Sequence, residues 1–173
     1  MIPAPRPADL VVTPLGARFR GRLFPCSIGR GGVSARKREG DGATPEGVHG
    51  FIGLLYRPDR IAPGALPGWA RPIGPNDIWT DEPGDPLYNK YITHAGHPHG
   101  HERLRRPDPL YDVILLTDWN WPVAVPGAGS AIFVHRWRAP GVPTAGCIGL
   151  APADLLWIAR RVDYRTRLIV APR

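Results

Sequence analysis

A cysteine and a histidine in the last third of the sequence have the residue types of a nucleophile and its base. His135 follows the apolar residues 130–134, and Cys147 follows a loop that contains Pro140 and Pro143. An imidazole beside a thiol takes the thiol proton, and the resulting thiolate attacks an acyl carbon. The pair therefore predicts an acyl-transfer site, while a buried cysteine and a strand-end histidine with structural roles are the alternative.

The glycine beside Cys147 fits the same chemistry. Gly146 lets the backbone approach a substrate carbonyl closely, and we expect the N–H groups of Gly146 and Cys147 to form an oxyanion hole, in which each donor contributes on the order of 3 kcal/mol. The second cysteine, Cys26, has no neighbouring histidine or glycine loop. We expect Cys26 to be a core residue, and a disulfide between the two cysteines stays open.

Residues 94–101 contain histidines at positions 94, 97, 99 and 101, which are possible zinc ligands. They lie on a Gly/Pro loop, however, and no cysteine or carboxylate set has the spacing of a zinc site. We therefore expect no metal, and we interpret the segment as a polar loop near the substrate entrance.

Buried strands are needed to position the pair. Residues 111–117 and 130–134 are continuous apolar runs typical of buried strands, and the second delivers His135 at its end. The remaining elements expected in the second half are a helix over residues 152–162 and a last strand over 166–170.

The first half predicts a hairpin, a loop and a strand. Residues 9–13 and 17–23 should pair and continue into 24–28, with Arg18, Arg20 and Arg22 on the wet face and Phe19 and Leu23 toward the core. The polar, glycine-rich residues 29–47 predict a long surface loop without a phosphate-loop pattern. Residues 48–56 predict a strand, and a proline-rich traverse follows it.

Composition favours one mainly β domain. The 173 residues suit a single domain over 1–173, in which residues 1–8 form an extended tail. The 21 glycines and 22 prolines indicate many turns between short strands, because 43% hydrophobic residues argue against disorder.

The formal charge of +7 predicts attraction to polyanions, but the arginines are scattered, which favours a solvated basic surface over a nucleic-acid site. No apolar run is long enough to span a bilayer, and residues 1–7 lack the features of a signal peptide. The chain is therefore expected to be cytosolic as written, or to have lost a leader.

Several motifs together carry a resemblance that covers residues 9–171. Thr144-Ala-Gly146-Cys147-Ile-Gly-Leu after His135 resembles the signature of the YkuD-type L,D-transpeptidase catalytic domain. Thr44-Pro-Glu-Gly47 looks like the Thr-Pro-x-Gly segment of that family. Further segments are similar to a compact bacterial subgroup of it: Trp79-x-Asp-x-Pro, Tyr88-Asn89, His101-Glu102-x-Leu104, Asp108-x-Leu-Tyr111-Asp112 and Gly127-x-Gly-Ser-Ala-Ile-Phe-x-His135.

The resemblance implies a β-sandwich or barrel-like domain with one or two short helices, and a peptidoglycan transpeptidase that remodels the cell wall and cell shape. Cys147 would be the nucleophile that forms a thioester with a stem peptide, and His135 its base. Thr144 would shape the loop and hydrogen bond near the thiolate. No metal or organic cofactor is implied, and the partners would be donor and acceptor stem peptides. The expected substrate-binding residues are Arg138, which suits a carboxylate, together with His101, Glu102, Tyr111 and Gly149.

Some positions depart from the familiar family pattern. Ala145 stands where a histidine is usual, Gly149 where an arginine or asparagine is usual, and Arg136 where a glycine often follows the base. These changes leave the Cys/His chemistry intact and allow a different bond in the stem peptide to be used. The alternatives are an L,D-carboxypeptidase that trims stem peptides during recycling and a non-catalytic basic module that binds wall polymer. We expect a monomer, placed in the periplasm or envelope if a leader was removed and in the cytoplasm otherwise.

Overall fold

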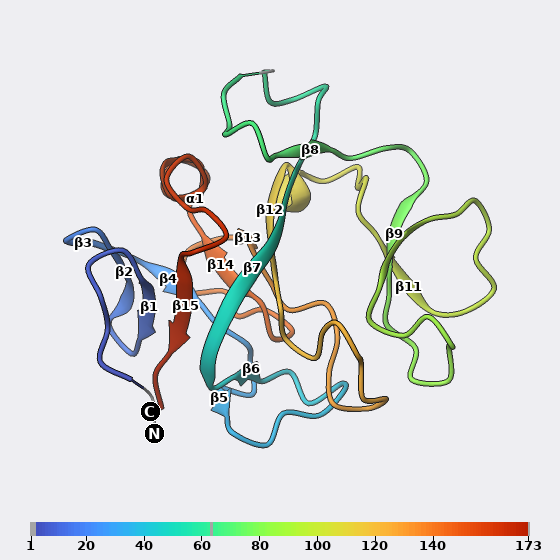
Figure 1. Ribbon diagram of the computed structural model, residues 1–173, viewed down its shortest axis with the longest axis horizontal. Coiled ribbons are helices and arrows are strands. Elements are labelled where there is room, and N and C mark those ends of the chain that lie inside the picture. The colour runs from blue at the N-terminus through green and yellow to red at the C-terminus, as the bar shows by residue number, and fades with distance from the viewer. Residues whose placement is uncertain (1–2, 63, 173) are drawn as a thin grey trace.

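A computed structural model describes residues 3–62 and 64–172, and its main feature is one strongly curved sheet that is nearly closed like a barrel (Figure 1). Along the sheet the order is β3-β2-β1-β15-β7-β12-β13-β14-β4, and β8 pairs with β7. The strands are β1 (Leu10–Thr13), β2 (Gly16–Phe19), β3 (Arg22–Phe24), β4 (Cys26–Ser27), β7 (Gly47–Tyr56), β8 (Arg71–Pro72), β12 (Val113–Thr117), β13 (Phe133–Arg136), β14 (Ile148–Leu150) and β15 (Arg167–Val170).

Two small sheets and two helical segments complete the fold. The three-stranded sheet β10-β9-β11 stands to one side of the main sheet (Figure 1) and is formed by β9 (Asp77–Thr80), β10 (Tyr91–Thr93) and β11 (His101–Arg103). A two-stranded sheet joins β5 (Val33–Ser34) to β6 (Thr44–Pro45). The helical segments are the 3₁₀ turn η1 (Pro109–Tyr111) and the helix α1 (Pro152–Ala159). The mainly β fold with short helices is therefore confirmed.

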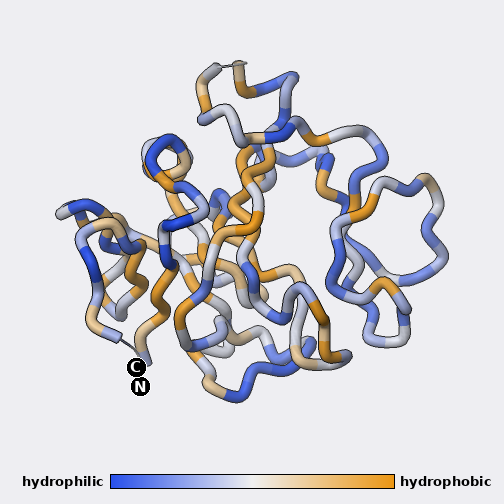
Figure 2. Tube along the Cα trace, viewed as in Figure 1, coloured by the Kyte–Doolittle hydropathy of each residue, from blue (hydrophilic) through white to orange (hydrophobic). Residues whose placement is uncertain are grey.

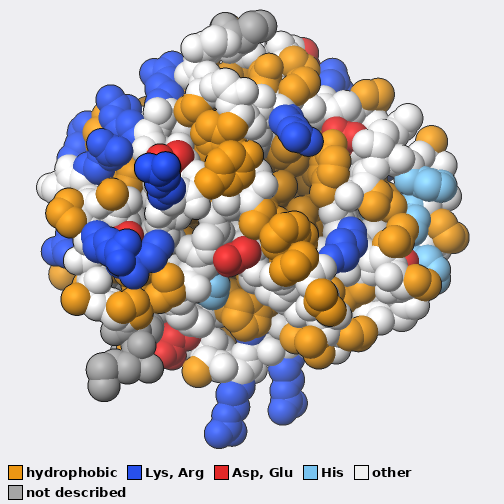
Figure 3. Space-filling view, in the orientation of Figure 1, with side chains coloured by type: hydrophobic (Ala, Val, Ile, Leu, Met, Phe, Trp, Pro, Cys, Tyr) orange, Lys and Arg blue, Asp and Glu red, His pale blue; other side chains and the backbone are white. Residues whose placement is uncertain are grey.

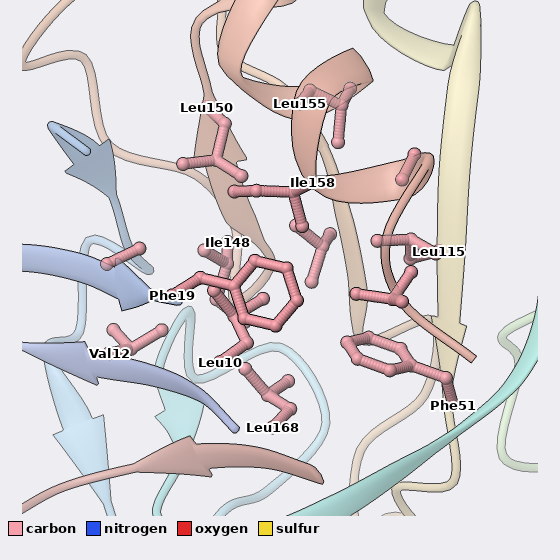
Figure 4. Close-up of a cluster of buried hydrophobic side chains, with 14 of the residues drawn as sticks. Leu10, Val12, Phe19, Phe51, Leu115, Ile148, Leu150, Leu155, Ile158 and Leu168 are labelled. Carbon is pink, nitrogen blue, oxygen red and sulfur yellow. The ribbon is translucent and has the colours of Figure 1, made fainter. Parts of the chain in front are cut away.

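The core forms where hydrophobic strands converge on α1. Figure 2 shows the hydrophobic residues concentrated along the central strands and the hydrophilic ones in the turns. Side chains from strands far apart in the sequence meet in one cluster (Figure 4): Leu10, Val12, Phe19, Phe51, Leu115, Ile148, Leu150, Leu155, Ile158 and Leu168. Because both β12 and β13 pack against α1, the base-bearing strand is fixed from one side by this core.

The predicted strand over residues 17–23 is wrong. A turn at Arg20 and Gly21, both with positive φ (48° and 76°), divides it into β2 and β3. Arg18 pairs with Leu23 and Arg22 pairs with Phe19, so the two arginines lie on opposite faces of the hairpin. Arg20 lies in the turn, and Leu23 is 56% exposed instead of facing the core. Phe19 is buried as predicted. The prediction for Arg20, Arg22 and Leu23 assumed an uninterrupted strand with alternating faces. The two-residue turn changes which of the following residues point inward.

The other predicted elements are found with small shifts at their ends. The strands at 48–56, 111–117, 130–134 and 166–170 correspond to β7, β12, β13 and β15, and the predicted helix corresponds to α1. Residues 29–47 are mostly loop, yet Thr44 is fully buried, so this segment is not simply a surface loop. Residues 3–8 are exposed and form no strand or helix, while residues 1–2 of the predicted tail lie outside the described residues.

Candidate functional site

Two adjacent strands bring the cysteine and the histidine to one cavity. β13 and β14 pair in parallel, with Val134 opposite Ile148 and His135 opposite Gly149, and Cys147 directly precedes β14. Both side chains line a cavity of about 620 Å³, and both residues are 8% exposed. The long separation in sequence is closed because the loop over 137–146 returns the chain beside β13.

The Cys147 thiol is held by the backbone of the strand beside it. Sγ donates a hydrogen bond to the carbonyl oxygen of Ala131 (3.1 Å) and accepts one from the N–H of Phe133 (3.4 Å). Burial raises the pKa of this thiol to about 12, and the charge of Glu102 adds to the shift. The resting group at neutral pH is therefore a protonated thiol. Both cysteines are free, and Cys26 packs half-buried against the main core.

His135 is oriented by its own strand end. Nδ1 lies 2.6 Å from the carbonyl oxygen of Arg136, which can only accept, so Nδ1 carries the proton and Nε2 keeps its lone pair. The ring of Tyr111 lies edge-on to the imidazole, with 5.2 Å between ring centroids. Burial lowers the pKa of His135 to about 4, so the imidazole is neutral at pH 7. Among residues 3–62 and 64–172, no hydrogen bond joins Sγ to the imidazole.

The loop that carries Cys147 is shaped by two threonines. The Thr144 hydroxyl donates to the carbonyl oxygen of Cys147 (2.6 Å) and accepts from the N–H of Gly146 (3.1 Å). The buried Thr44 hydroxyl donates to the carbonyl oxygen of Gly146 (2.8 Å) and accepts from the N–H of Gly29 (2.9 Å). The Thr144 hydroxyl thus joins two backbone groups of this loop, and the Gly146 N–H, expected in the oxyanion hole, points to Thr144 in this state. Sequence reasoning gave Thr44 no site role, although its Thr-Pro-x-Gly motif had marked the segment.

Gly146 itself has a conformation that few other residues adopt. Its φ is +143°, and a Cβ atom there would lie 2.9 Å from the carbonyl oxygen of Ala43 and 3.2 Å from Cδ1 of Ile132. A side chain at this position would therefore be strained twice, by its backbone angle and by contact with the neighbouring loop.

Most of the predicted substrate-binding residues surround the cavity. His101, Glu102, Tyr111 and Arg138 line it together with Thr144 and Ala145. Gly149 does not: it is buried opposite His135, and a Cβ there would lie 3.0 Å from Cβ of Trp137. The structure adds lining residues that sequence reasoning missed, namely Arg103, Arg106, Pro107, Asp108, Leu110, Val142 and Pro143. The available signals were the quoted motif for Asp108 and Leu110, nearness to residues 101–102 and 108–111 for the three lining residues within 103–107, and nearness to Thr144 for Val142 and Pro143.

The charged groups of the cavity wall are paired unequally. Arg106 binds Asp108 in a forked arrangement, with nitrogen–oxygen distances of 2.7 to 3.2 Å. Tyr111 donates its hydroxyl hydrogen bond to Oε2 of Glu102. Arg138 makes no hydrogen bond or ion pair with any residue in the described ranges. The Arg103 side chain likewise makes no hydrogen bond or ion pair with the described residues. The cavity wall therefore offers two guanidinium groups without an acidic partner, and one carboxylate, that of Glu102, without an ion pair.

The histidine-rich loop reaches the cavity only through His101. His97 binds Asp85 (2.6 Å) and lies 5.6 to 5.7 Å, between ring centroids, from the rings of His94, His99 and His101. Within the described part of the chain, no group of three or more His, Cys, Asp or Glu side chains is placed to hold a metal ion. The loop borders the cavity without itself forming a metal centre.

The surface outside the cavity is basic but not continuously so. Lys and Arg side chains appear as separate groups on the face seen in Figure 3, and histidines gather near one edge. A second cavity, of about 260 Å³, is lined by β7 residues and by Trp69, Trp79, Tyr91, Trp121 and Tyr164, with Arg71 and Lys90. It contains neither Cys147 nor His135. Of the helices in the described ranges, none could cross a membrane.

Comparison with known proteins gives one match. The family model for the L,D-transpeptidase catalytic domain, YkuD, matches residues 16–170, which is nearly the whole chain and includes every residue of the cavity wall. No curated protein and no solved structure matches the chain.

Proposed function

Because the chain belongs to the YkuD family of L,D-transpeptidase catalytic domains, which act on peptidoglycan, we propose that it cross-links stem peptides through a thioester on Cys147. The observation that carries the proposal is the placement of Cys147 and His135 on one cavity by two adjacent parallel strands. Stem peptides of peptidoglycan are the substrates that the family implies. The cavity, at about 620 Å³, has the size of a site for a short peptide.

The resting state is a neutral thiol and a neutral imidazole, so the reaction begins with a proton transfer. Since Nδ1 of His135 is held by the Arg136 carbonyl, Nε2 is the atom that accepts the Sγ proton. Sγ must leave its hydrogen bond with the Ala131 carbonyl to make this transfer. We therefore propose that a bound donor peptide, by displacing water and reorienting Sγ, triggers formation of the thiolate.

The two half-reactions follow. The thiolate attacks the donor carbonyl carbon, the terminal residue of the donor leaves as an amine that receives the proton from His135, and an acyl-enzyme remains. An amine of a second stem peptide then attacks the thioester and releases the cross-linked product. In the carboxypeptidase alternative, water takes the place of that amine.

Arg138 is the candidate for binding a carboxylate of the donor. It lines the cavity, and its guanidinium is uncommitted among the described residues, whereas Arg106 is already bound to Asp108. A guanidinium binds a carboxylate through two parallel hydrogen bonds, which would fix the peptide beside Sγ. We place this reaction in the cell envelope, where the polymer lies.

The test is incubation of purified tetrapeptide muropeptides with the wild type and with Cys147→Ala, and Cys26→Ala serves as the matched control. Dimers should form with the wild type and with Cys26→Ala, and none with Cys147→Ala. Trimmed monomers without dimers would favour the carboxypeptidase alternative. Full activity of Cys147→Ala would refute the assignment, and polymer binding without any product would favour the non-catalytic module.

A further inference from the structure

Glu102 is a carboxylate on the wall of the Cys147 cavity that has no cation partner. Its Oε2 accepts the Tyr111 hydroxyl, and Oε1 accepts no hydrogen bond from the residues that the structure describes. The charge of the Arg106 guanidinium acts on Glu102, but this guanidinium binds Asp108 through Nε and Nη2. Glu102 therefore forms no ion pair among the described residues, although the Arg106 charge acts on it without direct contact.

Further acids lie near Glu102 and disfavour its ionised form. Asp81 and Glu39 both repel the ionised form of Glu102 and, with burial, raise its pKa. Glu39 is itself held by hydrogen bonds from Tyr88 and Ser130. Lys37, a cation whose charge acts on Cys147, forms an ion pair with Asp41 at 2.6 Å. Glu102, Asp81 and Glu39 therefore repel one another, and a cationic group bound at Glu102 would relieve this repulsion.

The position of Glu102 is costly for the first half-reaction. Its charge raises the pKa of Cys147, so it disfavours the thiolate that must attack the donor. Its hydrogen-bond partner Tyr111 packs edge-on against both His135 and Phe133, at 5.2 and 6.1 Å between ring centroids, and the Phe133 N–H binds Sγ. Glu102 lines the same cavity as the Cys147 thiol and opposes ionisation of that thiol. A role in the second half-reaction would explain its presence there.

We propose that Glu102 binds the ammonium group of the acceptor stem peptide and takes one proton from it, which makes this side of the cavity the acceptor subsite. The inference rests on the proposed function of Cys147. The ammonium passes one proton to the Glu102 carboxylate and becomes an amine. Its nitrogen attacks the thioester carbon, the C–S bond breaks as the amide bond forms, and a second proton moves from that nitrogen to Sγ.

The raised pKa of Glu102 suits this role. A carboxyl whose pKa is raised by burial is a stronger base than an exposed one, and its protonation removes the charge that opposes sulfur as leaving group. Water carries no charge, so hydrolysis of the thioester gains nothing from binding at Glu102. The residue would thus favour amine over water, and so cross-linking over trimming.

The test uses Glu102→Gln, because glutamine can still accept the Tyr111 hydrogen bond while losing the charge and the basicity. Glu46→Gln, outside the cavity, removes the same charge as the control. Each protein is acylated with a tetrapeptide donor, and the acyl-enzyme is then offered a stem-peptide amine or hydroxylamine, which is uncharged at pH 7. For Glu102→Gln we expect the rate with the stem-peptide amine to fall about tenfold or more, as for loss of one buried charge pair. The rates with hydroxylamine and water should not fall, since neither nucleophile needs the charge and the neutral glutamine no longer opposes sulfur as leaving group.

Equal loss with both nucleophiles, or no loss with the stem-peptide amine, would overturn the inference. A wild-type protein that forms no acyl-enzyme would instead contradict the proposed function. If Glu102→Gln does not acylate, the salt dependence of the wild-type acyl-enzyme is the test. Added salt should slow its reaction with a cationic amine and leave its reaction with hydroxylamine unaffected, because salt screens only the attraction between charged groups. Equal salt effects on the two nucleophiles would refute the role of Glu102.

Discussion

The buried hydroxyl of Thr44 is predicted to hold the catalytic loop, and Thr44→Val tests this with almost no change in shape. The hydroxyl accepts from the Gly29 N–H at 2.9 Å and donates to the Gly146 carbonyl at 2.8 Å, and the residue is fully buried. Valine fills the same volume but satisfies neither group. A buried backbone group left without its partner costs about 1 to 3 kcal/mol, so two such groups predict a loss of about 2 to 6 kcal/mol.

The assay is urea unfolding followed by fluorescence of the six tryptophans. With a slope of about 2 kcal/mol per molar urea, the predicted loss shifts the midpoint down by roughly 1 to 3 M. Thr44→Ser keeps the hydroxyl and should lose only about 1 kcal/mol, the contribution of one buried methyl group. Because the Gly146 carbonyl is released only in Thr44→Val, transpeptidation should also fall in that variant under conditions where it is still folded.

Two results would refute this reasoning. One is a Thr44→Val protein that unfolds within about 0.5 kcal/mol of wild type, which would mean that Gly29 and Gly146 find other partners or water. The other is a Thr44→Ser protein as destabilised as Thr44→Val, which would assign the effect to the lost methyl group. Equal activity of the folded wild type, Thr44→Val and Thr44→Ser would show that the Thr44 hydroxyl does not help to position Cys147.

Three further predictions concern the same cavity. Gly146→Ala should lower the free energy of unfolding by about 3 kcal/mol or more, because the backbone angle and the 2.9 Å contact both oppose a side chain. Gly141→Ala, with φ +77° and open space around it, should lose only about 1 kcal/mol in the same urea assay. Equal losses in the two variants would contradict the packing argument. Without substrate, alkylation of Cys147 by iodoacetamide should keep rising with pH above 9, because the pKa of its thiol is about 12, and a plateau below pH 8 would contradict the resting neutral thiol. The pKa of His135 is about 4 in the folded protein and about 6.5 in the unfolded chain, so between these values the unfolded chain binds the proton more tightly. The free energy of unfolding should therefore fall by up to about 3 kcal/mol as the pH drops from 6.5 to 4. His135→Gln should remove this pH dependence, and an unchanged pH dependence would contradict the assignment.

The elements around the site follow from sequence because their signals are local. The apolar runs that became β12 and β13 are fully buried, and burial on both faces is what a continuous apolar run indicates. His135 could be placed at a strand end for the same reason. The helix α1 was recognisable because Pro152 and Asp154 in its first turn favour a helix start and its apolar residues share one face.

Pairings between distant segments left no such signal. Thr44 lies in a polar glycine-rich segment, and only tertiary contact with the loop at Gly146 makes its hydroxyl structural. The exclusion of Gly149 from the cavity follows from the parallel register of β13 and β14, which sets its position opposite His135 beneath Trp137. Register between strands depends on long-range packing, so the place of Gly149 in the family motif near Cys147 did not reveal that it lies outside the cavity lining.

The account depends most directly on a covalent bond between Cys147 and the donor peptide, and intact-protein mass spectrometry measures it. After brief exposure to a tetrapeptide donor without acceptor, the wild type and Cys26→Ala should both gain the mass of the donor acyl group without its terminal residue. Cys147→Ala should gain nothing, and hydroxylamine should remove the adduct from the other two proteins because it cleaves a thioester. An adduct on Cys147→Ala, or cross-linked product formed by that variant, would contradict the central claim.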